Sequence, residues 1–377
     1  MAILALCHRN IPWITFKIVI LLVPLIICVD LLCARKFSIA HRLVYGGLVG
    51  SRTTGARDGG GSWIPHLCPH YSRRGRQTHP LQWEPPSVDT IFFTQTSCVK
   101  ALTAREACAV ESSSIYHPHR PVLVLLTAPD PDQDHPLLKV LQGLANVRLA
   151  WLDLDQVFED ENLRTWHQNR QWMFSDGRAS AEVSDAVRAE LLRRFGGTYV
   201  DLDAITLRPL PSLNNWLGRV DDALVNTAVV SFSPGHPLLQ DVVSSIPTSF
   251  NPQGCCSIGP NLFTHILHQS CPKNVTTPSS ADPDQAEHCN GVTIFPRSYF
   301  YPIHYGYKKD QLQSIFREGE GLGRAFLSNT HAFSLHLFHS VSSKSTVSLS
   351  GDSILKEVAI DNCPEVFQCL QEHNLPL

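Results

Sequence analysis

The chain has 377 residues, more than the ~100 to 200 of one typical domain, so it suits one large or two small domains with accessory sequence. A formal net charge of −3 excludes a global cationic field for nucleic acid, and no nucleic-acid partner is expected. The remaining unusual features are the 12 cysteines and 18 histidines, so their positions carry information.

Residues 11–33 are almost entirely apolar and come close to the ~20 residues that a membrane helix needs. Lys17 and Asp30 lie near the two ends of this run, where charged side chains reach the interface at low cost. A cleaved signal peptide is the alternative, but no small-residue cleavage site follows the run. We predict a cytoplasmic tail at 1–10 and an uncleaved transmembrane signal anchor at 11–33.

The charges that flank the apolar run do not settle its orientation, so the side of the membrane is inferred from other features. The sequon at Asn274 and the many cysteines beyond the anchor suit an oxidising lumen, with a chance sequon and reduced thiols as the alternative. Cys271 and Cys289 bracket a polar loop and are the first pair to test as a disulfide. Adjacent Cys255 and Cys256 do not form the pattern of a zinc site.

Glycine, serine, arginine, threonine and proline dominate the segment after the anchor, without periodicity. This composition predicts a flexible stem at 34–86 that holds the following body away from the bilayer. The body is predicted at 87–377, as a lumenal domain with a first half at 87–232 and a second half at 233–377.

Short apolar runs followed by polar turns mark buried strands in the first half of the body. They lie at Thr90–Thr94, Val122–Leu126 and Asn146–Trp151, with a helix at Ala104–Ser114 between the first two. Alternating strands and helices of this kind predict an open α/β sheet.

A further helix at Ser184–Phe195 carries an apolar stripe, and Asp185 and Arg188 share another of its faces. A surface ion pair is the simplest interpretation of these two residues. The helix stops at Gly196, however, and the short turn that follows brings this face beside the next strand.

That next strand is predicted to finish on Asp201 and Asp203. Side chains two apart on a strand point the same way, so the two carboxylates are expected to converge. Hard carboxylate oxygens suit Mg²⁺ or Mn²⁺ that carries substrate phosphates. An Asp-x-Asp pair alone is a weak motif, but this pair lies at the carboxyl edge of the sheet, where open α/β sheets bind ligands.

These residues, in order, resemble the α1,4-glycosyltransferases. The similarity extends over about 89–363 and rests on an ordered set of matches: Cys108-Ala109-Val110-Glu111-Ser112, Ser184-Asp185-x-x-Arg188, Phe195-Gly196-Gly197-x-Tyr199-x-Asp201-x-Asp203, Val225-Asn226-Thr227-Ala228, Gly259-Pro260, Cys289-Asn290-Gly291-Val292 and Phe300-Tyr301-Pro302-Ile303. The resemblance implies a glycosyltransferase-A fold, with a mixed sheet flanked by helices, and a type II protein of the Golgi membrane.

The resemblance also implies a site for Mn²⁺ (or Mg²⁺) and a UDP-sugar donor. The implied metal ligands are Asp201, Asp203 and His336. The implied donor-binding residues are Phe92, Phe93, Thr94 and Thr96, which would border the uridine, together with Asp185, Arg188, Tyr199, Asp201 and Leu202. The implied catalytic set is Asp203, Asp185, Arg188 and Asn226, although Asn226 is nearly as well explained as a hydrogen-bonding residue of its strand.

The similar family transfers sugars with retention at the anomeric centre, but no residue of the sequence can be named as a nucleophile. A front-side attack would need positioning and the departing phosphate as base. Two departures lie near donor and acceptor: Phe338-His339 stands where the family has Trp-Asn, and Ser257-Ile258 where it often has His-Gln. They leave the substrates open.

We therefore expect α1,4 transfer of galactose or N-acetylgalactosamine from UDP to a terminal sugar of a glycosphingolipid. An anchored site would meet lipid headgroups at high effective concentration. N-acetylglucosamine is the alternative donor, and an inactive glycan-binding Golgi protein is the alternative class. Assembly as a homo-oligomer or with other glycosyltransferases is a further expectation. A phosphotransferase ranks lower, because a Gly-x-x-x-x-Gly-Lys phosphate loop is absent.

Overall fold

The computed structural model describes residues 86–377 except 129, 176–177, 272–284 and 307–310. All of the described residues belong to one compact unit of the chain. The predicted tail, anchor and most of the stem, and the sequon at Asn274, lie outside them. Among the helices in these described ranges, none is both long and apolar enough to cross a membrane.

Eight strands form one mixed sheet in the order β3-β2-β1-β4-β7-β6-β9-β8. The first four in this order run parallel, and β7 is antiparallel to both of its neighbours, β4 and β6. A separate antiparallel pair is formed by β5 and β10. The strands are β1 (Ile91–Gln95), β2 (Val122–Leu126), β3 (Val147–Trp151), β4 (Gly197–Val200), β5 (Ala204–Thr206), β6 (Trp216–Arg219), β7 (Val225–Phe232), β8 (Glu287–Cys289), β9 (Val292–Phe295) and β10 (Ser334–His336).

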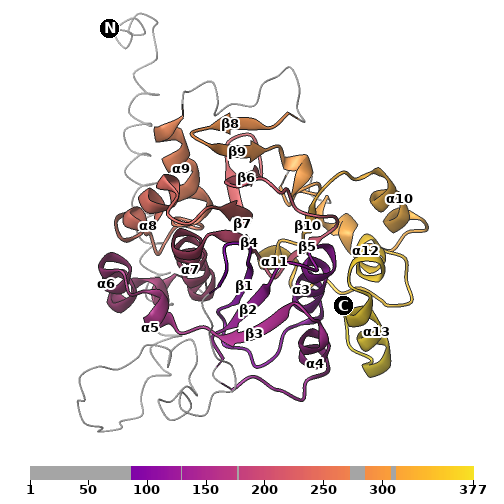
Figure 1. The fold of residues 1–377 in the computed structure, drawn as a ribbon. Helices are drawn as coiled ribbons and strands as arrows, with labels where there is room; N and C mark the ends of the chain where they lie inside the picture. The colour runs from indigo at the N-terminus through magenta and orange to yellow at the C-terminus, as the bar shows by residue number, and fades with distance from the viewer. Residues whose placement is uncertain (1–85, 129, 176–177, 272–284, 307–310) are drawn as a thin grey trace, which may run out of the picture. The chain divides into compact units, whose positions relative to one another are not determined.

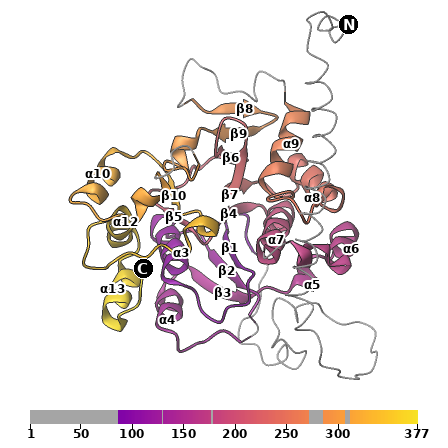
Figure 2. The ribbon, with the colours of Figure 1, turned by 180° about the vertical axis from the view of Figure 1, so that it is seen from behind.

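Helices flank the sheet in two groups, which Figures 1 and 2 show on opposite sides. The first group is α3 (Ala104–Tyr116), α4 (Pro136–Gly143), α10 (Leu322–Asn329), α12 (Ile354–Asn362) and α13 (Pro364–His373). The second is α5 (Leu154–Val157), α6 (Glu161–Asn169), α7 (Ala179–Phe195), α8 (Pro237–Ser249) and α9 (Pro260–Ser270), while the short α11 (His339–Ser342) follows β10. The prediction of a mixed α/β sheet flanked by helices is confirmed.

Each group of helices packs over its own hydrophobic core. Neighbouring residues of β1 divide between the two cores: Phe93 joins the core with α3 and α12, and Phe92 joins the core with α7 and α8. This division follows from the strand geometry, because successive side chains point to opposite faces of a sheet. Both phenylalanine rings are completely buried, so β1 is held firmly in the centre of the sheet.

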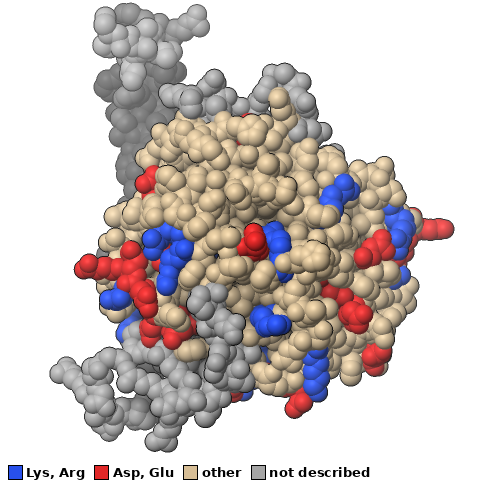
Figure 3. Space-filling model, viewed as in Figure 1, with Lys and Arg blue, Asp and Glu red and all other residues tan. Residues whose placement is uncertain are grey.

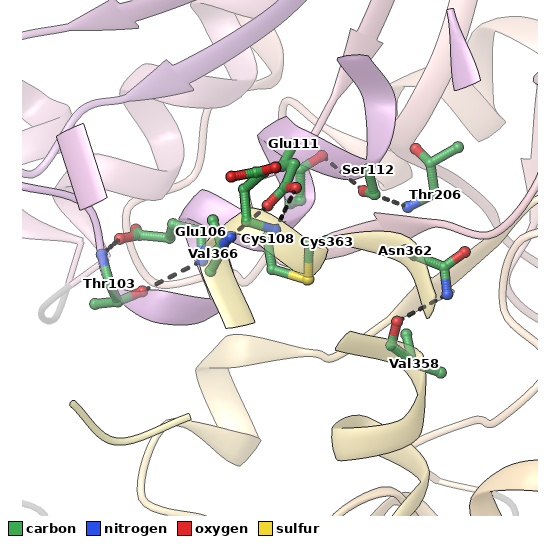
Figure 4. Close-up of a disulfide and its surroundings, with 12 residues drawn as sticks. Thr103, Glu106, Cys108, Glu111, Ser112, Thr206, Val358, Asn362, Cys363 and Val366 are labelled. Carbon is green, nitrogen blue, oxygen red and sulfur yellow. Dashed lines mark hydrogen bonds between the residues drawn. A yellow bond between two sulfur atoms is a disulfide. The ribbon is translucent and has the colours of Figure 1, made fainter. Parts of the chain in front are cut away.

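A disulfide between Cys108 and Cys363 joins α3 to the junction of α12 and α13 (Figure 4). Beside it, buried Glu111 accepts hydrogen bonds from the backbone N–H groups of Glu365 (2.9 Å) and Val366 (2.7 Å), which begin α13. These bonds satisfy two of the N–H groups that a helix leaves unpaired at its start. The end of the chain is thereby attached to the first helix of the body.

Other cysteines are also paired. Cys271 is bonded to Cys289, which confirms the pair predicted from the sequence. Adjacent Cys255 and Cys256 are joined as well. The described part of the chain holds one free cysteine, the buried Cys369.

Charged side chains of both signs are intermixed on the face drawn in Figure 3. An acidic group lies beside a basic group near the middle of this face, and the region over β6 and β9 carries few charges. The drawn face therefore presents no extended patch of one sign.

Candidate functional site

The turn between α7 and β4 places a buried helix face beside the carboxyl end of a central strand. Gly196 and Gly197 adopt φ values of 67° and 96°, which residues other than glycine rarely adopt. A Cβ atom at Gly197 would also collide with the carbonyl oxygen of Thr90. The two glycines are therefore required for α7 to reverse directly into the sheet.

Asp201 and Asp203 lie in a turn and not, as predicted, at the end of the strand. β4 ends at Val200, and the Ala204 N–H donates to the Asp201 carbonyl at 3.0 Å to close the turn. The Asp201 N–H still donates to the Ala228 carbonyl of β7 at 2.7 Å. The two carboxylates thus meet through the curvature of the turn, because the chain must change direction here to form β5.

His336 reaches this turn because β10 pairs with β5, with His336 opposite Ala204. Its Nε2 lies 3.1 Å from Asp203 Oδ1. Burial alone would lower the pKa of His336, but the Asp203 carboxylate outweighs burial and leaves this pKa raised. A histidine distant in sequence is thereby held against the second carboxylate.

Backbone groups after His336 complete the surroundings of Asp203. The His339 N–H donates to Asp203 Oδ2 at 2.7 Å, and the Leu337 N–H donates to the Asp203 carbonyl at 2.8 Å. Burial raises the pKa of Asp203, but His336 and the His339 N–H reverse the effect and hold the pKa well below its usual range. Asp203 is therefore ionised and fixed in orientation.

Asp201, Asp203 and His336 each offer a ligand atom, and these atoms lie within 4.8 Å of one another. Two carboxylate oxygens and an imidazole nitrogen suit Mn²⁺ or Mg²⁺, which favour oxygen ligands, with Mn²⁺ also accepting imidazole. The three side chains are buried or half-buried. The residues present therefore fit a divalent metal ion.

Arg188 on α7 binds the first of the two carboxylates. Its Nη2 lies 2.9 Å from Asp201 Oδ1 and 3.3 Å from Asp185 Oδ1. Its Nη1 donates to the Thr227 carbonyl at 2.8 Å and to the Thr227 hydroxyl at 3.0 Å. Burial alone would lower the pKa of Arg188, but Asp201 and its other neighbours raise it, so the guanidinium is charged. The predicted pairing with Asp185 is present, and both residues are buried, not on the surface.

Asp185 is also confined by the segment before α9. A Cβ atom at Gly259 would collide with the Asp185 carboxylate. Burial raises the pKa of Asp185 to about 6, against the opposing charge of Arg188. Gly259 therefore has a steric role. Without a side chain, it lets the backbone lie close to the Asp185 carboxylate, which holds Arg188 in its orientation.

Tyr199 makes a cation–π contact with Arg188, whose guanidinium lies over the Tyr199 ring at 4.5 Å from its centre. The Tyr199 hydroxyl is within 2.9 Å of both the Thr94 and Ser184 hydroxyls. The ring is 1% exposed. Tyr199 and Thr94, both predicted to bind the donor, are in this structure buried groups that position α7.

The other predicted donor-binding residues are placed in different ways. The Phe92 and Phe93 side chains belong to the cores, and Leu202 is buried in the same core as Phe93. The Thr96 hydroxyl donates to the Ser180 carbonyl at 2.7 Å, at the start of α7. The structure therefore places the Phe92 and Phe93 side chains away from the predicted contact with uridine. The half-buried Asn226 accepts a hydrogen bond from the Ala228 N–H at 3.0 Å.

Three contributions to the site were not predicted: the Thr227 acceptors for Arg188, the steric role of Gly259 and the His339 N–H donor to Asp203. Thr227 and Gly259 both lie within motifs shared with the α1,4-glycosyltransferases, so those motifs contain a usable signal. The backbone N–H of His339 leaves no trace in the sequence, because any residue except proline supplies one.

Two family models match this chain. One, described as a glycosyltransferase sugar-binding region containing a DXD motif, matches residues 103–221 and includes Asp201 and Asp203. The region that holds the two carboxylates is thus similar to glycosyltransferases of the DXD-containing class. The second, described as an α1,4-glycosyltransferase conserved region, matches residues 231–370 and includes His336.

Characterised relatives agree with the second model. Human lactosylceramide 4-α-galactosyltransferase is 28% identical over 290 residues, which cover 76% of this chain and 78% of that protein. Human α-1,4-N-acetylglucosaminyltransferase is 25% identical over 293 residues, with 74% and 80% covered. Over most of its length the chain is similar to the α1,4-glycosyltransferases.

Solved structures are more distant. The PaToxG glycosyltransferase is 16% identical with a TM-score of 0.38, and the match covers 50% of this chain and 71% of that chain. The galactosyltransferase LgtC, crystallised with donor and acceptor sugar analogues, is 13% identical with a TM-score of 0.32, and the match covers 66% and 87%.

Proposed function

We propose that this protein transfers galactose or N-acetylgalactosamine from a UDP-sugar, in α1,4 linkage, to the terminal sugar of a glycosphingolipid. The observation that carries the proposal is the group of Asp201, Asp203 and His336 with their ligand atoms within 4.8 Å, beside the buried guanidinium of Arg188. The similarity to a transferase whose name specifies lactosylceramide as acceptor supports the choice of a glycolipid.

Asp201, Asp203 and His336 would hold Mn²⁺ or Mg²⁺. When bound, such an ion would neutralise charge that develops on the departing diphosphate. Asp203 is already fixed for this role by the N–H groups of His339 and Leu337. Prepositioned ligands cost no reorganisation when the reaction occurs.

Arg188 would assist the same departure with a fixed positive charge. Its guanidinium is held by Asp185, Asp201 and Thr227 and lies over the Tyr199 ring. Side chains held in this way need little rearrangement to meet a phosphate oxygen. Asp185 would act through Arg188 and, from its place on the same helix face, on the donor sugar.

In the transfer, a bond forms between the acceptor hydroxyl oxygen and the anomeric carbon of the donor. The bond from that carbon to the phosphate oxygen of UDP breaks. In a front-side reaction the acceptor proton passes to the departing phosphate oxygen, so that retention requires no protein nucleophile. Asn226, near the start of β7, is proposed to hold the donor or the acceptor.

The experiment uses the full chain purified in detergent, with UDP-galactose, UDP-N-acetylgalactosamine and UDP-N-acetylglucosamine offered in turn. Lactosylceramide is the acceptor, and the assay is run with Mn²⁺, with Mg²⁺ and with a chelator. We expect metal-dependent transfer that falls at least 100-fold in Asp203→Asn. Asp361→Asn is the matched control, because Asp361 pairs with Arg324 on the surface formed by α10 and α12.

Equal transfer by wild type and Asp203→Asn would contradict the metal assignment. Preference for UDP-N-acetylglucosamine would favour the alternative donor, which the second human relative supports. UDP binding without hydrolysis or transfer of any donor would favour the glycan-binding alternative. The location in the Golgi membrane, with the body in the lumen, is part of the proposal and is tested by protease protection of sealed Golgi vesicles.

A further inference from the structure

Five aromatic side chains connect the metal-binding group to the protein surface, and we call them the aromatic chain: Tyr301, His304, Tyr305, His336 and Phe338. The ring of Phe338 lies at the centre. Its centroid is 4.3 Å from that of His336, and the two rings meet edge to face. It is 5.0 Å from Tyr305 and 6.0 Å from His304. His304 and Tyr305 stack at 4.5 Å, with 28° between their planes.

The aromatic chain is buried except at its outer end, Tyr305. Tyr301 is completely buried, and His304, His336 and Phe338 are buried almost fully. Tyr305 is 48% exposed, although its ring packs on two of the others. Tyrosine is enriched at interfaces, because its ring is apolar and its hydroxyl can form hydrogen bonds.

The backbone on both sides of Phe338 is fixed by Asp203, the residue whose carboxylate is proposed to bind metal. Phe338 has φ 50° and ψ 60°, a left-handed conformation that a bulky residue rarely adopts. The residues on both sides of it donate their N–H groups to Asp203. Strained backbone of this kind persists where the surroundings enforce it, and it concentrates at functional sites. The Phe338 ring is therefore placed at a set position relative to Asp203.

We propose that Tyr305, backed by His304 and Phe338, stacks on the apolar face of the terminal sugar of the acceptor. This inference rests on the proposed function. The acceptor sugar must lie beside the donor sugar. Because it is neutral, charged groups of the protein give it little affinity. The C–H groups on one face of a galactose, in contrast, can pack on an aromatic ring. Pockets for such ligands combine aromatic walls with a few polar groups. Tyr305 is separated from the metal-ligand candidate His336 by one intervening ring, Phe338.

The test compares Tyr305→Ala with Tyr305→Phe in the full chain in detergent. Ile115→Ala is the matched control, because Ile115 is 43% exposed on α3. The first readout is binding of methyl β-lactoside in the presence of UDP and Mn²⁺, measured by saturation-transfer NMR, which requires no turnover. The second is the KM for the acceptor, together with the KM for the UDP-sugar.

We expect Tyr305→Ala to weaken lactoside binding and to raise the acceptor KM roughly tenfold, in line with the loss of one ring contact. The KM for the UDP-sugar should not change, and Tyr305→Phe and Ile115→Ala should match wild type. Equal lactoside binding by wild type and Tyr305→Ala, or no lactoside binding by wild type, overturns the inference. Normal transfer by Tyr305→Ala with an unchanged acceptor KM overturns the inference and leaves the proposed function intact. Lactoside binding that depends on Tyr305, without transfer of any sugar, supports the inference and contradicts the proposed function.

Discussion

Arg188 and Asp201 form a buried ion pair in which Nη2 of Arg188 lies 2.9 Å from Oδ1 of Asp201. The pair joins α7 to the turn after β4. Its carboxylate is at the same time one of three candidate metal ligands. The Arg188 guanidinium thus couples α7 to the candidate metal site. We expect changes in α7 to alter the position of the Asp201 carboxylate.

Arg188 variants test this coupling. Arg188→Met leaves Asp185 and Asp201 without their cation, which should cost about 3–5 kcal/mol of stability and abolish transfer. Arg188→Lys keeps the charge but loses the planar fork, so it should retain folding better and lose roughly 10- to 100-fold in kcat/KM. Thermal unfolding and donor kinetics measure the two effects. Arg324→Met, at an exposed ion pair, is the control, and an Arg188→Met protein as stable as this control would refute the coupling.

Gly259→Ala tests the steric role assigned to that glycine. The added methyl group would collide with the Asp185 carboxylate and displace it from Arg188, which should reduce transfer at least tenfold while costing about 1–3 kcal/mol of stability. Gly143→Ala is the matched control, because a Cβ atom there would meet no described atom within 4 Å. Wild-type kinetics in Gly259→Ala would show that the close approach has no bearing on the reaction.

The disulfide between Cys108 and Cys363 closes a loop of sequence separation 255. Removal of both cysteines by alanine substitution should destabilise the chain by about 2–5 kcal/mol, because the unfolded chain regains the freedom that the bond removed. Chemical denaturation measures this loss. Cys369→Ala is the control for loss of a buried sulfur without a bond. A double variant no less stable than Cys369→Ala would mean that Glu111 and the packing of α13 suffice to hold the C-terminus.

His167 on α6 should make stability depend on pH. Its ring is 3% exposed and stacks on Trp172 at 5.5 Å. Burial lowers the pKa of His167 to about 4, with Asp155 opposing and Arg170 adding to this shift. Between the ordinary histidine pKa and about 4, the unfolded chain therefore binds a proton that the folded chain does not, and stability falls as the pH falls.

The effect of His167 amounts to roughly 3 kcal/mol between pH 7 and pH 4. Burial raises the pKa of Glu111 and of Glu182 to about 7, so these carboxyls act in the opposite direction over the same range. The measurement is therefore the difference in unfolding free energy between wild type and His167→Phe across this range, with the exposed His119→Asn as control. Parallel pH profiles for wild type and His167→Phe would show that the ring binds a proton equally well in the folded and the unfolded chain.

The α/β class and the bounds of β2 could be predicted from the sequence, because each depends on a local pattern. Apolar runs of strand length predict β1 and β2, and Thr103 with Glu106 forms a capping box that starts α3 where the helix was expected. The carboxylates of Asp201 and Asp203 and the charge of Arg188 are likewise properties of the residues themselves. Similar residues in the same order then give the resemblance to the α1,4-glycosyltransferases.

Tertiary structure alone decided how those residues meet. The Asp-x-Asp pair forms a turn and not a strand end, because β5 must turn away to pair with β10 and bring His336 to Asp203. Phe92 and Phe93 are core residues because β1 is covered on both faces. Such pairings join segments far apart in the chain, and their free energy comes from burial and charge contacts that no local pattern contains. The sequence by itself determined which groups are available for metal and phosphate, and the fold determined which of them share one site.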